Sequence, residues 1–496
     1  MSWGQSLASK NTKQCSVDDI TLVCTASRRI LRLFSQIKNA ERVNEELLVA
    51  LKFGHETSDE DDCSRYIAMN GNSTNRAPQT YQSQTWYGIR ATVPALNARG
   101  EEIIASFYQS LLRGHPELRS YFNTANQLNK LQPKAMASLI IQFANNVSHI
   151  YELIPKMERI CQKHCSVGVQ PHHYKIMGAY LLEAFTGILD PSMTPDAKMA
   201  WNNAYWMLAN MFIAREKQLY KTFGPWTDWR PFDVADRVHE GENVVSFYLK
   251  PRDKKPLPPF MPGQYVSIRV AVPGKEHKQI RQYALSEAPN PDYYRITVQR
   301  NRGAGAGGIP DEQHQSACPY ASPPGAVSNH LIDSAVAGDT LELSHPAGHI
   351  FLDTKNLSNA PLVLFSTGIG ATPMLSILNF TAKEQPGRPV SWINASQGAM
   401  PFQARVDSLA ARRKNLRNTT LGIAHDGHAS ADCDGQDDAR LDLVSLRPDD
   451  LFLRNECTEY FVCGAENITV QFVEFLERHG IDRARIHCEL QTVARY

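Results

Sequence analysis

Two short strings of residues have the side chains and the spacing to do chemistry together. The first is Arg281-Gln282-Tyr283-Ala284-Leu285-Ser286, and the second, further along the chain, is Gly368-Ile369-Gly370-Ala371-Thr372-Pro373. On a strand, Arg281 and Tyr283 share one face, where arginine suits a diphosphate and tyrosine offers a flat ring to a flavin. In the second string, glycines let a phosphate approach the start of a helix, and Pro373 is expected at the first helical position, where its missing N–H costs nothing. In this order, the strings indicate electron transfer from a nicotinamide to a flavin.

Three further segments extend these two expected cofactor sites. Gly325-Ala326-Val327-Ser328 offers backbone N–H groups and a hydroxyl to the same diphosphate. Pro262-Gly263-Gln264-Tyr265 supplies a second aromatic side chain. Cys463-Gly464-Ala465 follows the buried strand EYFV and is expected at the carboxyl edge of a parallel sheet, where ligands bind.

The pattern of apolar residues changes twice along the chain. Apolar periodicity over 87–222, interrupted by Gly and Pro, is typical of helices. Short β-rich runs then predict an antiparallel barrel, and alternating strands and helices predict a parallel α/β sheet. The stretches 301–324 and 414–445 are expected to be loops. We predict a multidomain chain with a partly disordered N-terminal extension (1–85), an all-helical domain (86–222), an antiparallel β-barrel (228–357) and a parallel α/β domain (360–496).

Composition excludes several classes of protein. The chain has 496 residues, 42% of them hydrophobic and 21% charged, as is usual for globular proteins. A net charge of +1 gives no basic face for nucleic acid, and no apolar run approaches the roughly 18 residues of a membrane span. The 10 cysteines are irregularly spaced, which indicates reduced thiols in an intracellular protein. We expect small-molecule substrates and no obligate protein partner.

The N-terminal extension carries the weakest signal. Residues 28–53 have amphipathic, initially basic character, and residues 54–85 are polar and predicted to be disordered. A mitochondrial presequence would be amphipathic and rich in arginine, but here Asp18 and Asp19 come early and the basic stretch begins late. We therefore predict a cytoplasmic protein with a family-specific extension, and keep a mitochondrial location as the alternative.

The helical region resembles a globin in two segments. FYQSLLRGHPELRSYFNTANQ matches the globin stretch that ends in the haem-packing phenylalanine, here Phe122. ICQKHCSVGVQPHHY matches the segment of the proximal histidine, which makes His164 the expected iron ligand. Haem needs a neutral imidazole whose other ring nitrogen is held by a hydrogen bond, and Glu216 is the candidate partner, with Tyr174 beside it. On the opposite side of the haem, Tyr108 and Gln132 are candidates to donate hydrogen bonds to bound dioxygen.

Other histidines and cysteines nearby have alternative interpretations. His172 and His173 are rival ligands, which we interpret as turn residues. Cys161 and Cys165 flank His164 and could suggest zinc, but no further ligands stand at a suitable spacing, so we interpret them as helix thiols.

Taken together, the chain is identified as a divergent, fungal-type member of the flavohaemoglobin (nitric oxide dioxygenase) family. The resemblance covers about 90–496 and is densest in the globin part, for example HPELRSYFN and HYKIMGAYLLEA. It implies a globin, an FAD barrel like that of ferredoxin reductases, and an NAD(P) domain, with haem b, FAD and NAD(P)H as cofactors. It also implies a reaction: NAD(P)H reduces FAD, FAD reduces haem iron, and ferrous haem with dioxygen converts nitric oxide to nitrate.

The resemblance assigns a role to each matching residue. It implies iron ligation by His164, a charge-relay pair in Tyr174 and Glu216, and a distal oxygen-stabilising pair in Tyr108 and Gln132. Cofactor contacts are implied for haem at Phe122 and Lys163, for flavin at Tyr265, Arg281, Gln282, Tyr283, Ala284, Gly325, Val327, Ser328 and Glu489, and for nicotinamide at Gly368, Ile369, Gly370, Ala371, Thr372, Pro373, Cys463 and Gly464.

Three positions depart from the family pattern, all where flavin meets nicotinamide. Ala284 replaces a serine that meets the flavin N5, and Ser286 is the candidate substitute. Gln491 replaces an aromatic residue that packs on the flavin, and Tyr496 is the candidate substitute there. Ala465 replaces the proline of Cys-Gly-Pro. Losing one hydrogen bond at N5 would cost about 1–3 kcal/mol and slow hydride transfer.

These departures leave two other functions open. One is a haem protein that binds dioxygen or nitric oxide and whose reductase is impaired. The other is a flavohaem reductase that passes electrons to a different acceptor, such as a hydroperoxide, and would keep its activity after His164→Ala.

Overall fold

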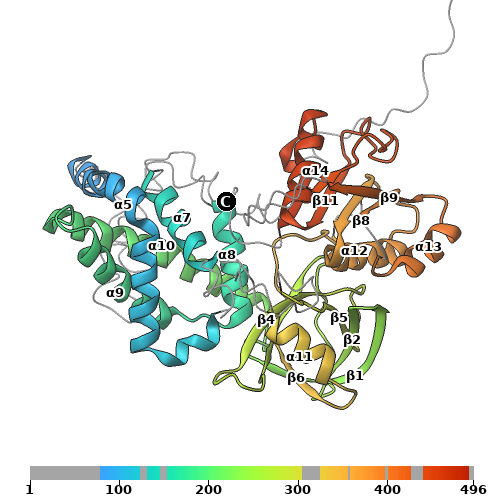
Figure 1. Ribbon diagram of the computed structural model, residues 1–496, viewed down its shortest axis with the longest axis horizontal. Coiled ribbons are helices and arrows are strands. Elements are labelled where there is room, and N and C mark those ends of the chain that lie inside the picture. The colour runs from blue at the N-terminus through green and yellow to red at the C-terminus, as the bar shows by residue number, and fades with distance from the viewer. Residues whose placement is uncertain are drawn as a thin grey trace, which may run out of the picture.

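The computed structural model describes residues 79–122, 131–145, 154–303, 324–355, 358–396, 400–425 and 439–490. Nearly all of the expected N-terminal extension lies outside these residues. The described chain forms three parts, one helical and two built on β-sheets, so the predicted fold classes are confirmed (Figure 1). No helix among the described residues is both long enough and apolar enough to cross a membrane.

The helical part packs long amphipathic helices around an apolar core. Side chains from several helices meet in it, including the buried Phe107, Phe143, Phe185 and Trp201. Trp201 also donates its indole N–H to the hydroxyl of Thr92, at 3.0 Å, so its one polar atom is paired inside the core. The elements are α5 (Gln79–Gly114), η1 (Pro116–Tyr121), α7 (Leu131–Asn145), α8 (Ile154–Val167), α9 (Pro171–Ile188) and α10 (Pro195–Thr222).

Local signals in the sequence set the starts of two of these helices. Pro195 stands in the first turn of α10, and the hydroxyl of Thr194 accepts a hydrogen bond from the backbone N–H of Ala197. At the start of α9, His173 reaches back to accept from the N–H of Gln170, forming a capping box with Pro171 in the first turn. His173 therefore has a structural role, but it lies in the first turn of helix α9 and not in a turn between elements as expected.

The first β-part is a six-stranded antiparallel sheet in the order β4-β3-β6-β1-β2-β5. A bridge between Leu285 and Ile296 joins the end of β4 to β5, so the sheet curls into the predicted barrel. A short helix, α11 (Ala326–Ser334), lies against β4 and β5. The strands are β1 (Arg230–Gly241), β2 (Val244–Pro251), β3 (Tyr265–Val270), β4 (Gln279–Ala284), β5 (Tyr294–Gln299) and β6 (Thr340–Leu343).

The second β-part is a sheet in the order β10-β9-β8-β7-β11-β12, parallel except for β10. Val363 and Phe365 of β7 pack with α14 on one face, whereas Leu364 packs with α12 on the other. The elements are β7 (Leu362–Thr367), η3 (Gly368–Gly370), α12 (Ala371–Glu384), β8 (Val390–Ser396), α13 (Gln403–Arg412), β9 (Leu416–His425), β10 (Ala439–Leu441), β11 (Glu459–Gly464), α14 (Glu466–Arg478), η4 (Arg483–Arg485) and β12 (Ile486–Leu490).

The structure corrects the expectation of a loop over 414–445. β9 and β10 fall in this stretch and pair with one another, and β9 also extends the sheet beside β8. Leu421, Ala439 and Leu441 contribute to the core. The Asp- and Gly-rich residues that suggested a loop lie in 426–438, outside the described residues. Because this Asp- and Gly-rich composition is typical of loops, the apolar residues of the flanking strands β9 and β10 were not recognised as strand signals.

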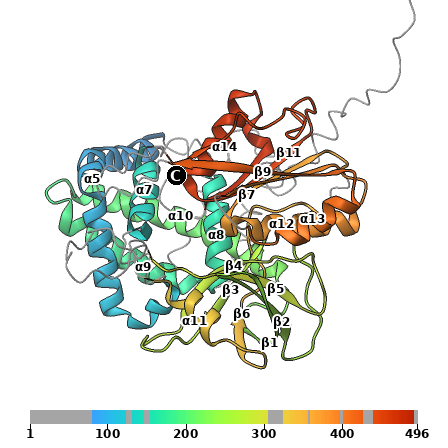
Figure 2. The same ribbon diagram turned by 45° about the vertical axis from the view of Figure 1, so that its right-hand side comes forward.

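The helical part meets the barrel along α8. Figures 1 and 2 place α8 at the side of the helical part that faces the sheets, next to the barrel. This position matters because α8 carries His164.

A pair of glycines on α9 tests the helical packing. A Cβ at Gly178 would lie 2.4 Å from the Tyr205 ring, whereas nothing lies within 4 Å of a Cβ at Gly187. We expect Gly178→Ala to destabilise the protein by about 1–3 kcal/mol because the packed, partly buried Tyr205 ring must move. Gly187→Ala should stabilise it by up to about 1 kcal/mol through helix propensity. Thermal unfolding followed at a helical circular-dichroism band measures both, and equal stabilisation would contradict this packing.

Candidate functional site

Three side chains from three helices meet at His164. Its Nδ1 lies 2.8 Å from Oε1 of Glu216 on α10 and 2.9 Å from the hydroxyl of Tyr174 on α9. The Tyr174 hydroxyl donates to the same Glu216 oxygen at 2.6 Å. Glu216 and Tyr174 are buried, whereas the His164 side chain is 27% exposed. The structure thus brings together three residues that are far apart in the sequence.

Hydrogen-bond accounting fixes the tautomer of His164. Burial and the Glu216 carboxylate raise the pKa of Tyr174, so its hydroxyl keeps its proton and donates it to Glu216. Both neighbours of Nδ1 are then acceptors, so Nδ1 must carry a proton in the neutral ring. Nε2 is left unprotonated and has no hydrogen-bond partner among the described residues. This is the state that a neutral imidazole needs to bind a metal ion.

The thiols beside His164 do not compete for a metal. Cys161 and Cys165 are buried, and burial raises the pKa of both, so they stay protonated. Within the described part of the chain, no group of three His, Cys, Asp or Glu residues is placed to hold a metal ion. Both cysteines lie on α8, as the interpretation as helix thiols predicts. These two cysteines are free, as expected. Cys457, two residues before β11, is disulfide-bonded, which contradicts the expectation of reduced thiols.

An apolar cavity adjoins the His164 cluster. It is lined only by apolar and aromatic side chains of α7, α8, α9 and α10, among them Phe143, Met157 and Phe212. Phe212 also packs against the His164 ring, with 6.0 Å between ring centres. A one-nitrogen donor beside apolar walls suits the edge of an apolar macrocycle better than a hydrated ion.

The other expected haem-side residues are only partly brought together. The ring of Tyr108 on α5 packs edge-on against Phe122, with 5.4 Å between centres. Gln132 lies in the first turn of α7, and its side chain is outside the described part of the structure. Lys163 is exposed next to His164 on α8.

The strand β4 presents different side chains on its two faces. In the ladder with β3, Gln282 lies opposite Ser267 and Ala284 lies opposite Tyr265. Arg281 and Tyr283 point to the other face, as predicted from alternation. Tyr265 therefore shares a face with Ala284 and not with Tyr283.

Arg281 is prepared for an anionic partner. Its side chain is partly buried, and this burial lowers its pKa. Its Nη1 donates to the carbonyl of Ile280 at 2.7 Å, and no carboxylate among the described residues pairs with it. A buried guanidinium without a counter-charge is costly, and a diphosphate would supply that charge. The donor set thus fits the expected dinucleotide.

A helix start lies beside this strand. Gly325 is the N-cap of α11, which begins at Ala326 and has the buried Val327 and the partly buried Ser328 in its first turn. A Cβ at Gly325 would lie 2.4 Å from the Ser328 hydroxyl and 2.8 Å from the Asn301 Cβ, so a larger residue would displace these neighbours. Unpaired N–H groups at a helix start attract anions. Because α11 lies against β4, the same diphosphate could reach both elements.

The turn after β7 packs tightly on the end of β11. A Cβ at Gly370 would lie 2.3 Å from the carbonyl oxygen of Cys463, and one at Gly464 would lie 2.2 Å from the Thr367 hydroxyl. By contrast, nothing lies within 4 Å of a Cβ at Gly368, whose φ is +50°. Gly370 and Gly464 thus serve packing, whereas Gly368 faces open space that a ligand could enter. Ile369 follows in the turn, and Ala371, Thr372 and Pro373 form the buried first turn of α12. The helix therefore begins two residues before Pro373, which was expected at its first position; the third position also needs no N–H for an intrahelical bond.

Other strands converge on the same sheet edge. Cys463 pairs with Ser366 on one side and Glu489 on the other, so the ends of β7, β11 and β12 lie side by side. This is the carboxyl edge at which ligands bind in such sheets.

The structure bears on two of the three positions that depart from the family pattern. Ser286 cannot take the place of the missing serine, because its hydroxyl is fully buried and bonded to Arg295 and, at 2.8 Å, to Thr297. Ala465 donates its backbone N–H to the Thr367 hydroxyl at 2.9 Å, a bond that proline could not make. Gln491 and Tyr496 lie outside the described residues.

Sequence reasoning missed the contacts between α8 and the barrel. The Ser166 hydroxyl lies 3.1 Å from the hydroxyl of Ser267 on β3 and accepts from the side-chain amide of Gln282 on β4, also at 3.1 Å. One turn earlier, the side-chain carbonyl of Gln162 accepts from the N–H of Gly348, 3.1 Å away, which lies against the Tyr265 ring. The helix of His164 is thus bonded to both strands of the expected flavin site. No local pattern signals contacts of this kind.

Known proteins share this arrangement. Residues 105–212 match the globin family model. The flavohaemoprotein of Bacillus subtilis is 34% identical over 407 residues, which are 81% of this chain and 95% of that protein. Flavohemoprotein A of Dictyostelium discoideum is 35% identical over 411 residues, 81% of this chain and 96% of that protein. The chain belongs to the flavohaemoprotein family.

A solved structure of the family supports the same architecture. The flavohaemoglobin of Malassezia yamatoensis, determined with bound FAD and haem, superposes with a TM-score of 0.65 and 26% sequence identity. The match covers 82% of this flavohaemoprotein and 98% of that chain. A match of this length must include the helical part and both β-parts, so all three parts are common to the two proteins.

Proposed function

We propose that this flavohaemoprotein is a nitric oxide dioxygenase, which uses NAD(P)H and dioxygen to convert nitric oxide to nitrate. Each nitric oxide that combines with dioxygen takes up one electron to become nitrate, so one hydride supports two turnovers. The observation that carries the proposal is the His164 cluster, which is held in a metal-binding tautomer on a helix bonded to the flavin strand.

The described residues fit three cofactors. Haem b would bind at Nε2 of His164 against the apolar cavity, with Phe122 and Lys163 at its rim. FAD would bind along β4 and the start of α11, with its diphosphate at Arg281, Gly325 and Ser328. NAD(P)H would bind at the turn Gly368–Gly370 and the edge formed by Cys463 and Gly464. When bound, haem supplies an iron with an open position for dioxygen, and FAD accepts a hydride and releases single electrons.

The side chains around His164 set the strength of the iron ligand. Glu216 draws on the Nδ1 proton, which makes the imidazole a stronger donor through Nε2. Tyr174 fixes the position of the carboxylate by donating to it. On the opposite face, Tyr108 and Gln132 are proposed to donate hydrogen bonds to the oxidant.

Nitric oxide consumption tests the proposal directly. Protein loaded with haem and FAD is given NADH or NADPH, dioxygen and nitric oxide, and an electrode follows nitric oxide. We expect rapid consumption with nitrate as the product, and complete loss in His164→Ala. In the same variant, anaerobic reduction of the flavin by NAD(P)H should remain, because His164 does not touch the nicotinamide edge.

Two outcomes would replace the proposal. If the flavin stays oxidised while chemically reduced haem still binds dioxygen, the protein is a gas-binding globin with an impaired reductase. If His164→Ala keeps its turnover with a hydroperoxide or another acceptor, the protein is a reductase for that acceptor.

Glu216 provides a test that does not depend on turnover. Glu216→Gln keeps the shape of the side chain but removes the negative charge from the Nδ1 hydrogen bond. A charge-assisted bond contributes about 1.5–3 kcal/mol, so part of that difference should raise the haem midpoint potential by roughly 40–80 mV. A redox titration of the haem band measures this, with Gln218→Glu on the exposed side of α10 as the control. An unchanged potential would contradict a role for the carboxylate.

Ser166 tests the contact between α8 and the barrel. Ser166→Ala removes the hydroxyl shared by Ser267 and Gln282, and losing two hydrogen bonds should slow flavin-to-haem electron transfer about fivefold to tenfold. Flavin reduction by NADH should not change. Stopped-flow absorbance resolves both steps. Thr186→Ala, which removes a hydroxyl bonded only within α9, is the matched control. Equal effects of the two variants would rule out a specific contact.

A further inference from the structure

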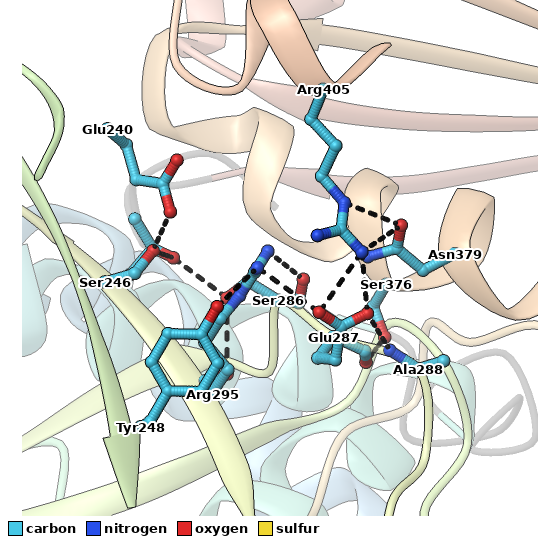
Figure 3. Close-up of polar contacts among 11 residues, drawn as sticks. Glu240, Ser246, Tyr248, Ser286, Glu287, Ala288, Arg295, Ser376, Asn379 and Arg405 are labelled. Atoms are coloured by element: carbon cyan, nitrogen blue, oxygen red, sulfur yellow. Dashed lines mark hydrogen bonds and ion pairs between the residues drawn. The ribbon is translucent and has the colours of Figure 1, made fainter. Parts of the chain in front are cut away.

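A polar network joins the segment after β4 to the nicotinamide half of the protein (Figure 3). Glu287 is at its centre, just beyond Ala284 at the end of β4. Its backbone carbonyl accepts from the hydroxyl of Ser376 on α12 at 2.7 Å. Its carboxylate lies 3.2 Å from Arg295 Nη1 on β5 and 3.2 and 3.3 Å from Arg405 Nη2 on α13. One residue therefore bonds to elements of both β-parts.

Arg295 makes the Glu287 carboxylate necessary. Arg295 is 2% exposed, and its other donors are used by Ser286, at 3.0 Å to the hydroxyl and 2.7 Å to the carbonyl. On the nicotinamide side, the buried Phe402 ring lies 5.6 Å from the guanidinium. A buried cation needs a counter-charge, and among the described residues only Glu287 pairs with it.

Arg405 connects the same carboxylate to the nicotinamide helix. Its guanidinium also donates to Oδ1 of Asn379 on α12, at 3.0 and 3.1 Å. Its side chain is 43% exposed, in contrast to Arg295. Glu287 thus lies between a buried arginine of the barrel and a half-exposed arginine of the α/β part (Figure 3).

These contacts join the two elements that carry the expected flavin and nicotinamide sites. α12 begins directly after the turn Gly368–Gly370, and both Ser376 and Asn379 lie on it. β4 carries Arg281 and Tyr283 and ends just before Glu287. Hydride transfer requires the reacting atoms to lie about 3–3.5 Å apart, and a misplacement of about 1 Å can cost a hundredfold in rate.

We propose that Glu287 is a positioning residue that sets the orientation of α12 and its nicotinamide turn on the flavin strand, and so governs hydride transfer. Glu287 contacts neither expected cofactor site itself. The inference rests on the reductase half of the proposed function, in which NAD(P)H reduces the flavin. It does not depend on the acceptor that the electrons finally reach.

The test is single-turnover reduction of the flavin. Protein loaded with FAD and haem is mixed anaerobically with increasing NADH or NADPH, and flavin absorbance gives the limiting rate and the half-saturating concentration. Glu287→Gln keeps the size of the side chain and the backbone bond to Ser376. We expect its limiting rate to fall about tenfold with little change in half-saturation, because the nicotinamide still binds but is misplaced.

Two further variants separate positioning from a general loss of structure. Arg405→Gln should have a smaller effect, about threefold, because Arg295 keeps its partner. The double variant should match Glu287→Gln alone, because both act through one carboxylate. Glu474→Gln, which breaks the exposed Arg478–Glu474 pair on α14, is the matched control and should leave the rate unchanged. A wild-type limiting rate in Glu287→Gln would overturn the proposal, as would an equal loss in the control.

Hydrogen exchange in α12 gives a second readout that needs no turnover. We expect faster exchange at the start of α12 in Glu287→Gln than in the wild type, with α14 unchanged. If wild-type flavin is not reduced by either nicotinamide, the reductase half of the proposed function fails and this readout alone decides. Unchanged exchange in α12 would then overturn the role of Glu287.

Discussion

The single proton on Nδ1 of His164 determines how three helices must pack. Glu216 is a buried carboxylate, and a buried charge is costly unless donors surround it. The imidazole N–H and the Tyr174 hydroxyl are the donors that meet it, each from a different helix. The charge is satisfied only when α8, α9 and α10 keep this arrangement. The geometry that leaves Nε2 open is therefore the geometry that stabilises the carboxylate.

The same helix serves a second set of neighbours. Gln162 and Ser166 are four residues apart and share a face of α8, which bonds to the barrel. His164 lies between them in sequence but is turned roughly 200° away, because each helical residue advances about 100°. One face of α8 thus holds the domain contact and the opposite face holds the expected iron ligand. Because α8 is a continuous helix, a shift of α8 relative to the barrel would also move His164.

The sequence predicted the secondary structure, which follows from local patterns. It did not predict contacts between elements that are far apart in the chain. Helices, barrel strands and the parallel sheet followed from periodicity, and the partners of His164 followed from their match to globin segments. β9 and β10 were mistaken for a loop because the Asp- and Gly-rich stretch between them dominated the local composition. Ser286 is the candidate substitute for the missing serine, but its hydroxyl forms hydrogen bonds with Arg295 and Thr297 of β5 instead. The contacts of Ser166 and Glu287 join segments far apart in the chain, so no spacing rule could reveal them.

β4 and the residues that directly follow it connect all three parts of the protein. Arg281 and Tyr283 lie on one face, and Gln282, on the other face, reaches the helix of His164. The chain then leaves the strand, and Glu287 reaches α12 and α13. Because strand side chains alternate, one short element presents the proposed flavin face and the face bonded to α8 without either blocking the other. The two contacts are polar, as is common at interfaces between domains. If the proposed cofactor sites are correct, both proposed electron transfers depend on the position of this single strand.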